Sequence, residues 1–313
     1  MSADNQTHAT NMPLSPKRNP FAEPGEWFKG NLHLHTTNSD GDYSPQATVD
    51  LYAQEGYDFL AITDHNRLTD PEDVDGHGMV LLPGVEFDGG RGELGQTYHM
   101  VALGVQHEVQ RLDAATSQEA LDQTRSHSEI VFLAHPYWSS LTAEDLMAVE
   151  GYDGIEVFNT TCERGIGRGH SEPQWDNLLT KGRLTMAMAV DDAHFHYWDT
   201  LGGWVWVKAP RLEYRGLMDS IKRGFFYASS GPEINNVVFA DDTVHVECSP
   251  VASVALVVAS PGKGWTTDRL RDGGDRPLIT EANLPSVHDL IFRIEVTDER
   301  GNRAWTNPYK IKS

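Results

Sequence analysis

The chain has 313 residues, of which 39% are hydrophobic and 23% charged, a size and composition that suit one large α/β domain with a small accessory domain. Its formal net charge of −21 disfavours nucleic acid and anionic lipid as partners, because such ligands are bound through Lys and Arg. The two cysteines, Cys162 and Cys248, are far apart and outside any CxxC spacing, which argues against a disulfide framework and against thiolate metal sites.

Residues 1–25 are polar and are interrupted by four prolines, and they lack the apolar stretch of a signal peptide. This composition predicts a flexible N-terminal arm. No apolar run in the chain approaches the roughly 20 residues that a membrane-spanning helix needs. We therefore expect a cytoplasmic protein that has no membrane contact.

Between residues 26 and 230, short apolar runs alternate with helix-like segments. The expected strands are Asn31–His35, Phe59–Thr63, Val80–Phe87, Tyr98–Val105, Ile130–His135, Gly154–Phe158 and Thr185–Asp191. Several are continuous apolar runs, as in strands buried on both faces. Ser44-Pro45 and Thr142 have the residue types that begin helices. The alternation predicts a mainly parallel sheet closed, or nearly closed, into a barrel, which is irregular between Phe87 and Tyr98 because that link is too short for a helix.

After Gly231-Pro232 the pattern changes to short strand-like runs separated by turn residues. The expected strands there are Val237–Phe239, Val244–Cys248, Val254–Val258 and Phe292–Val296. Residues 231–313 are therefore predicted to form a small C-terminal antiparallel domain resembling a β-sandwich.

Nine metal-ligating side chains lie at, or close to, the ends of the predicted strands. They are six histidines and three carboxylates: His33, His35, Asp40, His65, Glu86, His99, His135, Asp192 and His194. The carboxyl ends of barrel strands meet at one rim, where the active sites of this architecture lie. A single histidine at a strand end is more often a surface residue, but nine such side chains together predict a metal centre.

Imidazole and carboxylate ligands without thiolate suit zinc, manganese or iron. Because one ion needs about four or five protein ligands, nine side chains imply two or three divalent ions that share a bridging carboxylate. Glu86 is the expected bridge. Asp64 and Asp191 either orient ligand histidines or, in the case of Asp64, cap a turn.

At these motifs the sequence resembles the PHP (polymerase and histidinol phosphatase) superfamily. The matching motifs are His33-x-His35 followed by Ser39-Asp40-Gly41, Thr63-Asp64-His65, the strand-borne Glu86, His135-Pro136 and Asp192-x-His194. Further cues at Gly154–Asn159, at Tyr227–Pro232 and in the β-rich C-terminal extension resemble the carbaryl-hydrolase-like branch. The resemblance covers Asn31 to Ser230. It implies a distorted (β/α)7 barrel and a cluster of two or three metal ions.

The resemblance also implies how the ligands divide among the ions. The first ion would be held by His33, His35, Glu86 and Asp192, the second by Glu86, His99 and His135, and the third by Asp40, His65 and His194. His99 carries over only through its place on the strand that follows Glu86.

A divalent-metal centre predicts hydrolysis, because such ions lower the pKa of bound water and polarise the bond under attack. We expect a phosphoesterase that cleaves a small phosphomonoester or (cyclic) phosphodiester with a metal-bound hydroxide, and Glu86, Asp192 and His194 as the catalytic residues that hold its metal. The ions would leave the pocket positive inside an acidic shell, which favours a small anionic substrate. Two alternatives stay open: a metallo-esterase or carbamate hydrolase that acts on an aryl ester, and a non-catalytic metal-binding accessory module.

The candidate substrate contacts are cationic residues beside the rim. Arg67 follows His65, and Arg164, Arg168 and His170 lie in a glycine-rich stretch expected to be a loop. These side chains could bind a phosphate group, although a solvated loop is the alternative. Tyr137 and Trp138, which follow His135, could form an apolar wall for a leaving group or pack the rim. The oligomeric state is open, and a homodimer is one alternative.

Overall fold

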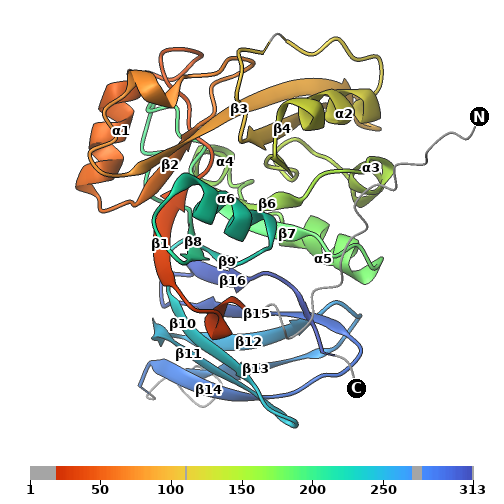
Figure 1. The fold of residues 1–313 in the computed structure, drawn as a ribbon. Helices are drawn as coiled ribbons and strands as arrows, with labels where there is room; N and C mark the ends of the chain where they lie inside the picture. Colours follow the sequence, from red (N-terminus) through yellow and green to blue (C-terminus); the bar gives the residue numbers. More distant parts are fainter. Residues whose placement is uncertain (1–18, 110, 270–276, 312–313) are drawn as a thin grey trace, which may run out of the picture.

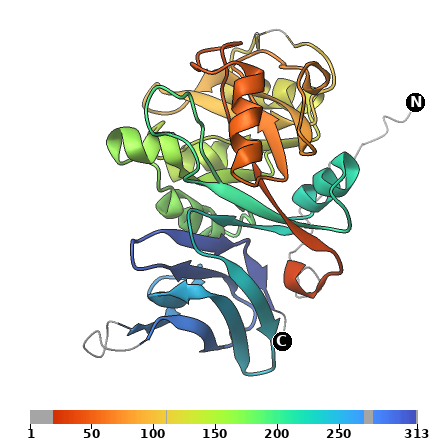
Figure 2. The same cartoon turned by 90° about the vertical axis from the view of Figure 1, so that its left-hand side faces the viewer.

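The computed structural model describes residues 19–109, 111–269 and 277–311. An α/β part lies above a β-rich C-terminal part in Figure 1, and the view at 90° in Figure 2 shows the same two layers. The helices are α1 (Pro45–Gln54), α2 (Ser117–His127), α3 (Ala143–Ala148), α4 (Thr160–Ile166), α5 (Glu172–Thr180) and α6 (Tyr214–Lys222), with the short 3-10 turns η2 (Pro20–Ala22) and η3 (Pro71–Asp73).

The α/β part is built on strands that are hydrogen-bonded in chain order. They are β1 (Glu26–Asn31), β2 (Phe59–Ile62), β3 (Val80–Arg91), β4 (Thr97–Leu103), β5 (Ile130–Leu133), β6 (Gly154–Asn159) and β7 (Met186–Val190). β1, β2 and β3 are parallel, as are β5, β6 and β7, whereas β4 runs antiparallel to both of its neighbours. The β3–β4 hairpin is the irregularity predicted from the short link after Phe87.

The closed barrel expected from the sequence is not confirmed. The strand order ends at β7, and β1 pairs on its other side with β8 (Trp204–Ala209), an antiparallel strand that the sequence analysis missed. The segments that follow β1 and β7 do meet, through a bridge between Leu34 and Ala193 and a hydrogen bond of 2.8 Å from the backbone N of Asp192 to the carbonyl of His33. The fold is thus a mixed α/β fold with one large open sheet.

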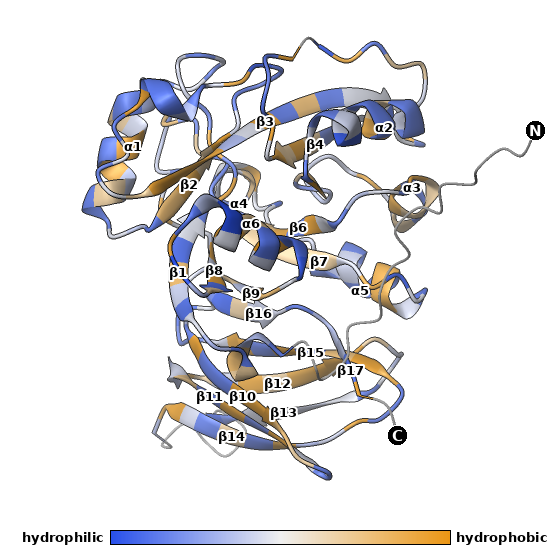
Figure 3. Ribbon diagram, in the orientation of Figure 1, coloured by the Kyte–Doolittle hydropathy of each residue, from blue (hydrophilic) through white to orange (hydrophobic). Residues whose placement is uncertain are grey.

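Local sequence explains why these elements form. Every residue of β2, β5 and β7 is buried, which accounts for their unbroken apolar sequences (Figure 3). Ser44 is the N-cap of α1, and its hydroxyl accepts a hydrogen bond from the backbone N of Ala47. Pro45 is the first residue of the helix, a position that proline favours. α3 begins with a capping box between Thr142 and Asp145. These helix starts were predicted correctly.

The large sheet continues into the C-terminal part. β9 (Phe226–Ser229) pairs with both β8 and β16 (Arg303–Thr306), and the sheet then runs through β15 (Ile291–Thr297), β12 (Ser253–Val258) and β13 (Gly264–Asp268), while β17 (Tyr309–Lys310) pairs with β15. A second sheet contains β10 (Ile234–Phe239), β11 (Thr243–Val251) and β14 (Ile279–Pro285). Buried side chains of both sheets, among them Val246 and Ile294, share one apolar core. The domain boundary at residue 230 stays a prediction.

The described end of the predicted N-terminal arm packs on the C-terminal part. The Asn19 amide donates to the carbonyl of Val237, and the Phe21 ring lies 5.0 Å from that of Trp27 and 5.9 Å from that of Tyr227. Asn19 and Phe21 are thus in contact with other segments, residues 1–18 lie outside the described residues, and the flexible arm stays a prediction. Among the described helices, none is long and apolar enough to cross a membrane.

Candidate metal centre

The innermost group of the site contains His33, His35, Glu86 and Asp192, all buried. Nε2 of His33 lies 3.1 Å from Glu86 Oε2 and 3.2 Å from Asp192 Oδ1. Nε2 of His35 lies 3.2 and 3.0 Å from the same two oxygens. The two imidazole nitrogens are 3.1 Å apart. The structure therefore brings together the four side chains expected to hold the first ion.

Glu86 is shared with a second group of histidines. Its Oε1 lies 2.9 Å from Nδ1 of His99 and 3.4 Å from Nε2 of His135, and its Oε2 lies 3.2 Å from Nδ1 of His65. One ligand atom each from His65, Glu86 and His99 lie within 4.8 Å of one another. His99 was selected only for its position on the strand after Glu86, and it lies beside Glu86 as expected. His65 lies close to this group and also to the third group, around Asp40.

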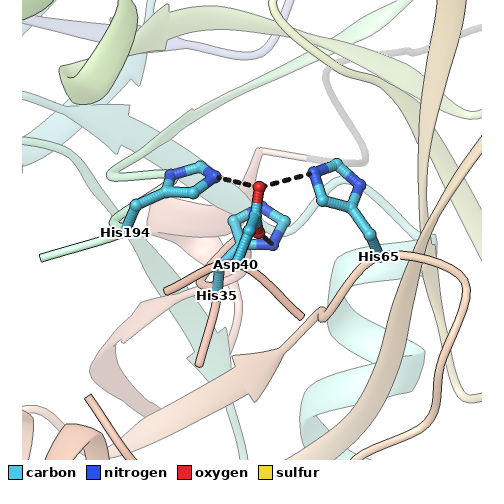
Figure 4. Close-up of side chains that lie close together, drawn as sticks. All are labelled: His35, Asp40, His65 and His194. Atoms are coloured by element: carbon cyan, nitrogen blue, oxygen red, sulfur yellow. Dashed lines mark ion pairs between the residues drawn. The ribbon is translucent and has the colours of Figure 1, made fainter. Parts of the chain in front are cut away.

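The third group surrounds Asp40 at the outer side of the site. Figure 4 shows the Asp40 carboxylate between the rings of His65 and His194, with His35 beside it. Asp40 Oδ2 lies 3.7 Å from Nε2 of His65 and 3.5 Å from Nε2 of His194, and its Oδ1 lies 3.6 Å from Nδ1 of His35. These four side chains also have ligand atoms within 4.8 Å of one another. The structure adds His35 to the expected trio.

Several of the ligands lie just beyond a strand, where the backbone turns, whereas Glu86 and His99 lie within β3 and β4. β1 ends at Asn31, two residues before His33, so the expectation that His33 and His35 belong to this strand is wrong. The bridge at Leu34 nevertheless keeps this segment beside Ala193. His135 and Asp192 follow β5 and β7 and have φ values of 27° and 56°, in or near the left-handed region that non-glycine residues seldom adopt. Such strain is typical of functional sites.

Glu156 is the main site residue that the sequence analysis did not select. It is fully buried on β6, and its Oε1 lies 2.6 Å from Nδ1 of His33. Its Oε2 accepts hydrogen bonds from the backbone N of His135 at 2.8 Å and from the Asn159 amide at 2.9 Å, and the same amide donates to Asp192. One buried carboxylate therefore orients side chains or backbone of three strand ends. The sequence does show that Glu156 is a charged residue inside a predicted apolar strand, and a buried carboxylate requires a hydrogen-bonding or charged partner.

Asp64 and Asp191 support the backbone around the site, and no hydrogen bond from a described histidine ring reaches either carboxylate. Asp64 accepts hydrogen bonds from the backbone N and hydroxyl of Thr36 and from the hydroxyls of Ser39 and Thr69. Asp191 accepts from the backbone N of 201, 202 and 203 and from the Tyr52 hydroxyl. Of the two roles considered, the structure supports backbone capping.

The electrostatics of the site favour charged partners. Burial disfavours the imidazolium of His35, but the adjacent carboxylates of Asp192 and Glu86 outweigh it and raise its pKa to about 9. Burial likewise opposes ionisation of Glu86, yet the neighbouring His33 and His99 hold the pKa of its carboxyl well below the usual range. The His194 hydrogen bond lowers the pKa of Asp40. The carboxylates are thus ionised and require positive charge beside them.

The donor atoms fit a metal ion. Asp192 Oδ1 is buried and accepts no well-directed hydrogen bond within the described part of the chain, although Nε2 atoms of two histidines lie about as close as hydrogen-bond partners. The ligand atoms of His33, His35, Glu86 and Asp192 lie within 4.8 Å of one another, close enough to bind one ion. Imidazole nitrogens and carboxylate oxygens are the donors that zinc, manganese and iron prefer. These residues could therefore hold divalent ions.

The predicted substrate contacts divide between two places. Arg67 and Arg168 are exposed and lie beside segments that contain candidate metal ligands. Arg67 approaches the carbonyl of Asn38, whereas Arg168 donates a hydrogen bond to the Ser140 hydroxyl and lies over the Tyr137 ring. Arg164 and His170 instead line a separate cavity. The expected flexible loop is in part helix, because α4 contains Arg164 and ends at Ile166, followed by Gly167 with a φ of 69°.

Comparison with known proteins gives short or distant matches, and no family model matches the chain. The chain is 42% identical over 40 residues to the DNA polymerase/3'-5' exonuclease PolX of Bacillus subtilis, which is 13% of this chain and 7% of that protein. It is 28% identical over 178 residues to an uncharacterized protein of Methanocaldococcus jannaschii, which is 54% of this chain and 66% of that protein. The chain thus spans less than two thirds of either relative.

A solved structure shares the whole arrangement. The chain matches a two-domain protein from Bacteroides vulgatus, described as containing a predicted PHP-like metal-dependent phosphoesterase, with a TM-score of 0.50 over 95% of this chain and 96% of that one. The sequence identity is 16%, so the likeness shows a common fold. That fold includes the α/β part and the C-terminal strands.

Proposed function

We propose that this protein is a metal-dependent hydrolase that cleaves phosphoric esters of small molecules. One observation carries the proposal: nine imidazole and carboxylate side chains from seven separate segments converge into three overlapping groups, each with its ligand atoms within 4.8 Å or joined through Glu86. Packing alone gives no reason to collect six histidines around three carboxylates. The motifs that resemble the PHP superfamily and the common fold support the same assignment.

Two or three divalent ions, zinc, manganese or iron, would be held by these residues. The innermost group would hold one ion, Glu86 with His99 and His135 a second, and Asp40 with His65 and His194 a third. Bound ions would supply Lewis-acid activation of water and of the ester. Glu86 lies beside at least one histidine of each group, His35, His99 and His65, which suits its expected role as a bridge.

The charge of the site favours an anionic substrate. The three carboxylates contribute −3, so two divalent ions would make the centre +1 and three would make it +3. A chain with a net charge of −21 surrounds this centre, which opposes long polyanions but leaves a small phosphate ester attracted to it. A small phosphomonoester or (cyclic) phosphodiester is therefore the substrate class that we favour over nucleic acid.

The open side of the centre is where the substrate would enter. The side chain of Asp40 is 53% exposed and that of His65 27% exposed, whereas His33 and His35 are fully buried. The substrate would thus approach over Asp40, His65 and His194. Glu156 accepts a hydrogen bond from Nδ1 of His33. This contact would fix the tautomer in which Nε2 carries no proton and is free to bind a metal ion.

A second candidate function is hydrolysis of an aryl carboxylic or carbamate ester. It is favoured by the Trp138 ring, which is 43% exposed and whose centroid lies 5.0 Å from that of His135 and 6.3 Å from that of His99. An exposed indole beside two ligands could stack on an aromatic leaving group. Membership of the carbaryl-hydrolase-like branch stays a prediction.

Substrate screening with a matched pair of variants tests the proposal. Purified protein loaded with Mn²⁺, Zn²⁺ or Fe²⁺ is assayed with p-nitrophenyl phosphate, bis-p-nitrophenyl phosphate and an aryl carbamate. We expect the phosphate esters to be cleaved, with activity lost on chelation and in His33→Asn. His77→Asn is the control, because His77 also pairs with a carboxylate, Asp50 at 2.7 Å, but at the surface. Cleavage of the carbamate alone would favour the second candidate, and a folded protein that binds no metal would exclude both.

A further inference from the structure

We propose that the protein has a second ligand site, separate from the metal centre, which binds a small organic anion. The site is a cavity of about 480 Å³ between α4, the segment 199–204 and the turn that joins β15 to β16. Within the described chain, none of the nine side chains of the metal centre lines it. The inference does not depend on the proposed hydrolase activity.

The cationic lining of the cavity begins with a fixed guanidinium. Nη1 of Arg164 donates to the carbonyls of Trp198 at 2.6 Å and of Thr200 at 2.8 Å. Its Nη2 has no such partner among the residues that the structure describes and lies against Gly202, because a Cβ added there would be only 2.9 Å from it. The absence of a side chain at Gly202 thus makes room for the guanidinium, which its two hydrogen bonds already hold in place before a ligand binds.

A second guanidinium comes from the β15–β16 turn. Asp298 fixes this turn through hydrogen bonds from the backbone N of Arg300 and of Asn302, and from the Asn302 amide. Gly301 completes it with a φ of 89°. No ion-pair partner is found for Arg300 among the described residues. The turn therefore presents an unneutralised cation on a rigid support.

A third basic side chain in the lining is His170. Burial disfavours its protonated form, but a hydrogen bond with Glu172 outweighs this and raises the pKa of the imidazole. Glu172 is held in turn by Arg303 at 2.8 Å. The lining contains one carboxylate, Glu163, which already accepts a hydrogen bond from the backbone N of Gly169.

The combination of charges and apolar groups defines the ligand. The two guanidiniums of Arg164 and Arg300 outnumber the one lining carboxylate, Glu163, whereas His170 is paired with Glu172. The lining therefore keeps a positive charge in a strongly acidic protein, which selects an anion. Phe158, Leu201 and Trp204 contribute the apolar wall, which suits the organic part of the ligand. A phosphorylated or phosphonylated small molecule with a ring fits both features.

Calorimetric titration with phenylphosphonate tests this site. EDTA treatment of His33→Ala protein removes the metal ions that would bind the probe at the metal centre, and the arginine variants then show whether the remaining binding occurs at the cavity. We expect binding to persist there and to weaken at least about tenfold in Arg300→Gln, and further in the Arg164→Gln/Arg300→Gln double variant, because hydrogen bonds to a charged group are lost. Arg211→Gln, whose side chain is 78% exposed on the loop before α6, is the control and should bind as tightly as its parent.

The outcomes are distinct. Loss of all binding in the EDTA-treated His33→Ala protein would show that phenylphosphonate binds only at the metal centre and would overturn the second site. Equal affinity of the parent and the Arg300→Gln variant would overturn it too. Because the Arg300 guanidinium supports no other described group, its replacement separates ligand binding from folding. Failure of the hydrolase assay would leave this result unaffected.

Discussion

Removal of the Glu156 carboxylate should weaken metal binding more than any other change outside the ligands themselves. Glu156→Ala deletes the acceptor of the His33 Nδ1 proton at 2.6 Å and of the His135 backbone N at 2.8 Å. The Asn159 amide loses one of its two carboxylate partners and keeps Asp192. His33 would then be free to rotate and to change tautomer.

The magnitude follows from these contacts. Two buried donors are left without an acceptor, each at a cost of about 1–3 kcal/mol, so the metal-free protein should lose roughly 2–6 kcal/mol of stability. Groups that orient metal-ligating histidines change metal affinity by about 10–100-fold. Glu156→Gln should fall in between, because its carbonyl can still accept one of the donors while its NH2 opposes another.

Competition with a chromogenic chelator measures the metal affinity, and urea unfolding in EDTA measures the stability. The matched control is Asp145→Asn, since Asp145 is also a buried carboxylate that accepts backbone hydrogen bonds, from Thr142 and Glu93, but it lies in α3. The control should lose stability and keep its metal affinity. If Glu156→Ala bound metal as tightly as the unmodified protein, the positioning role would be refuted.

Two further predictions use the same site. The folded-state pKa of His35, about 9, exceeds the unfolded value of 6.5, so the contribution of its protonation to stability is complete below pH 6.5 and is lost as the pH rises through 9. The Tm of EDTA-treated protein should therefore fall over this pH range, whereas the Tm of metal-loaded protein should not. Equal pH profiles of the two forms would contradict the assignment of His35 as a metal ligand. Asp191→Asn should destabilise the fold by at least about 3 kcal/mol, because Asn places an NH2 group against several of the groups that donate hydrogen bonds to Asp191, including the backbone N of 202 and 203. Urea unfolding measures this loss, and unchanged stability would show that the carboxylate is dispensable.

Much of the α/β part was predictable because its strands are buried on both faces. The runs Phe59–Thr63, Ile130–His135 and Gly154–Phe158 correspond to β2, β5 and β6 within two residues at each end. Ligands at strand ends then follow from the parallel geometry. The sequence could not show that β1 would end at Asn31, because the next residues, Leu32 and Leu34, are as apolar and as buried as a strand.

The sheet as a whole was harder to predict. β8 alternates partly buried and buried residues, and it pairs with β1 in place of a barrel neighbour. Through β9 it connects the α/β part to the C-terminal strands, a pairing between residues such as Trp305 and Ala228 that lie 77 positions apart. Local patterns contain no information on such distant partners. The separate C-terminal sandwich of the prediction was therefore in part an extension of the large sheet.

The site was predictable in its ligands and less so in its supports. Histidines and carboxylates have chemistry that a sequence shows directly, whereas Glu156 was missed because its role depends on which strand lies beside β5 and β7. Arg164 and His170 were expected to face the substrate, but the helix that contains Arg164 turns it to another cavity. A motif can indicate residue types, and the fold determines where they point.

The most direct test is a crystal structure of the protein loaded with Mn²⁺ or Zn²⁺, with anomalous scattering measured at the absorption edge of the metal. The account predicts two or three anomalous peaks, with Glu86 oxygens about 2.0–2.2 Å from at least two of them and His33, His135 and His194 each bound to a peak. A structure with no peak among these side chains, or with ions bound elsewhere on the chain, would contradict it.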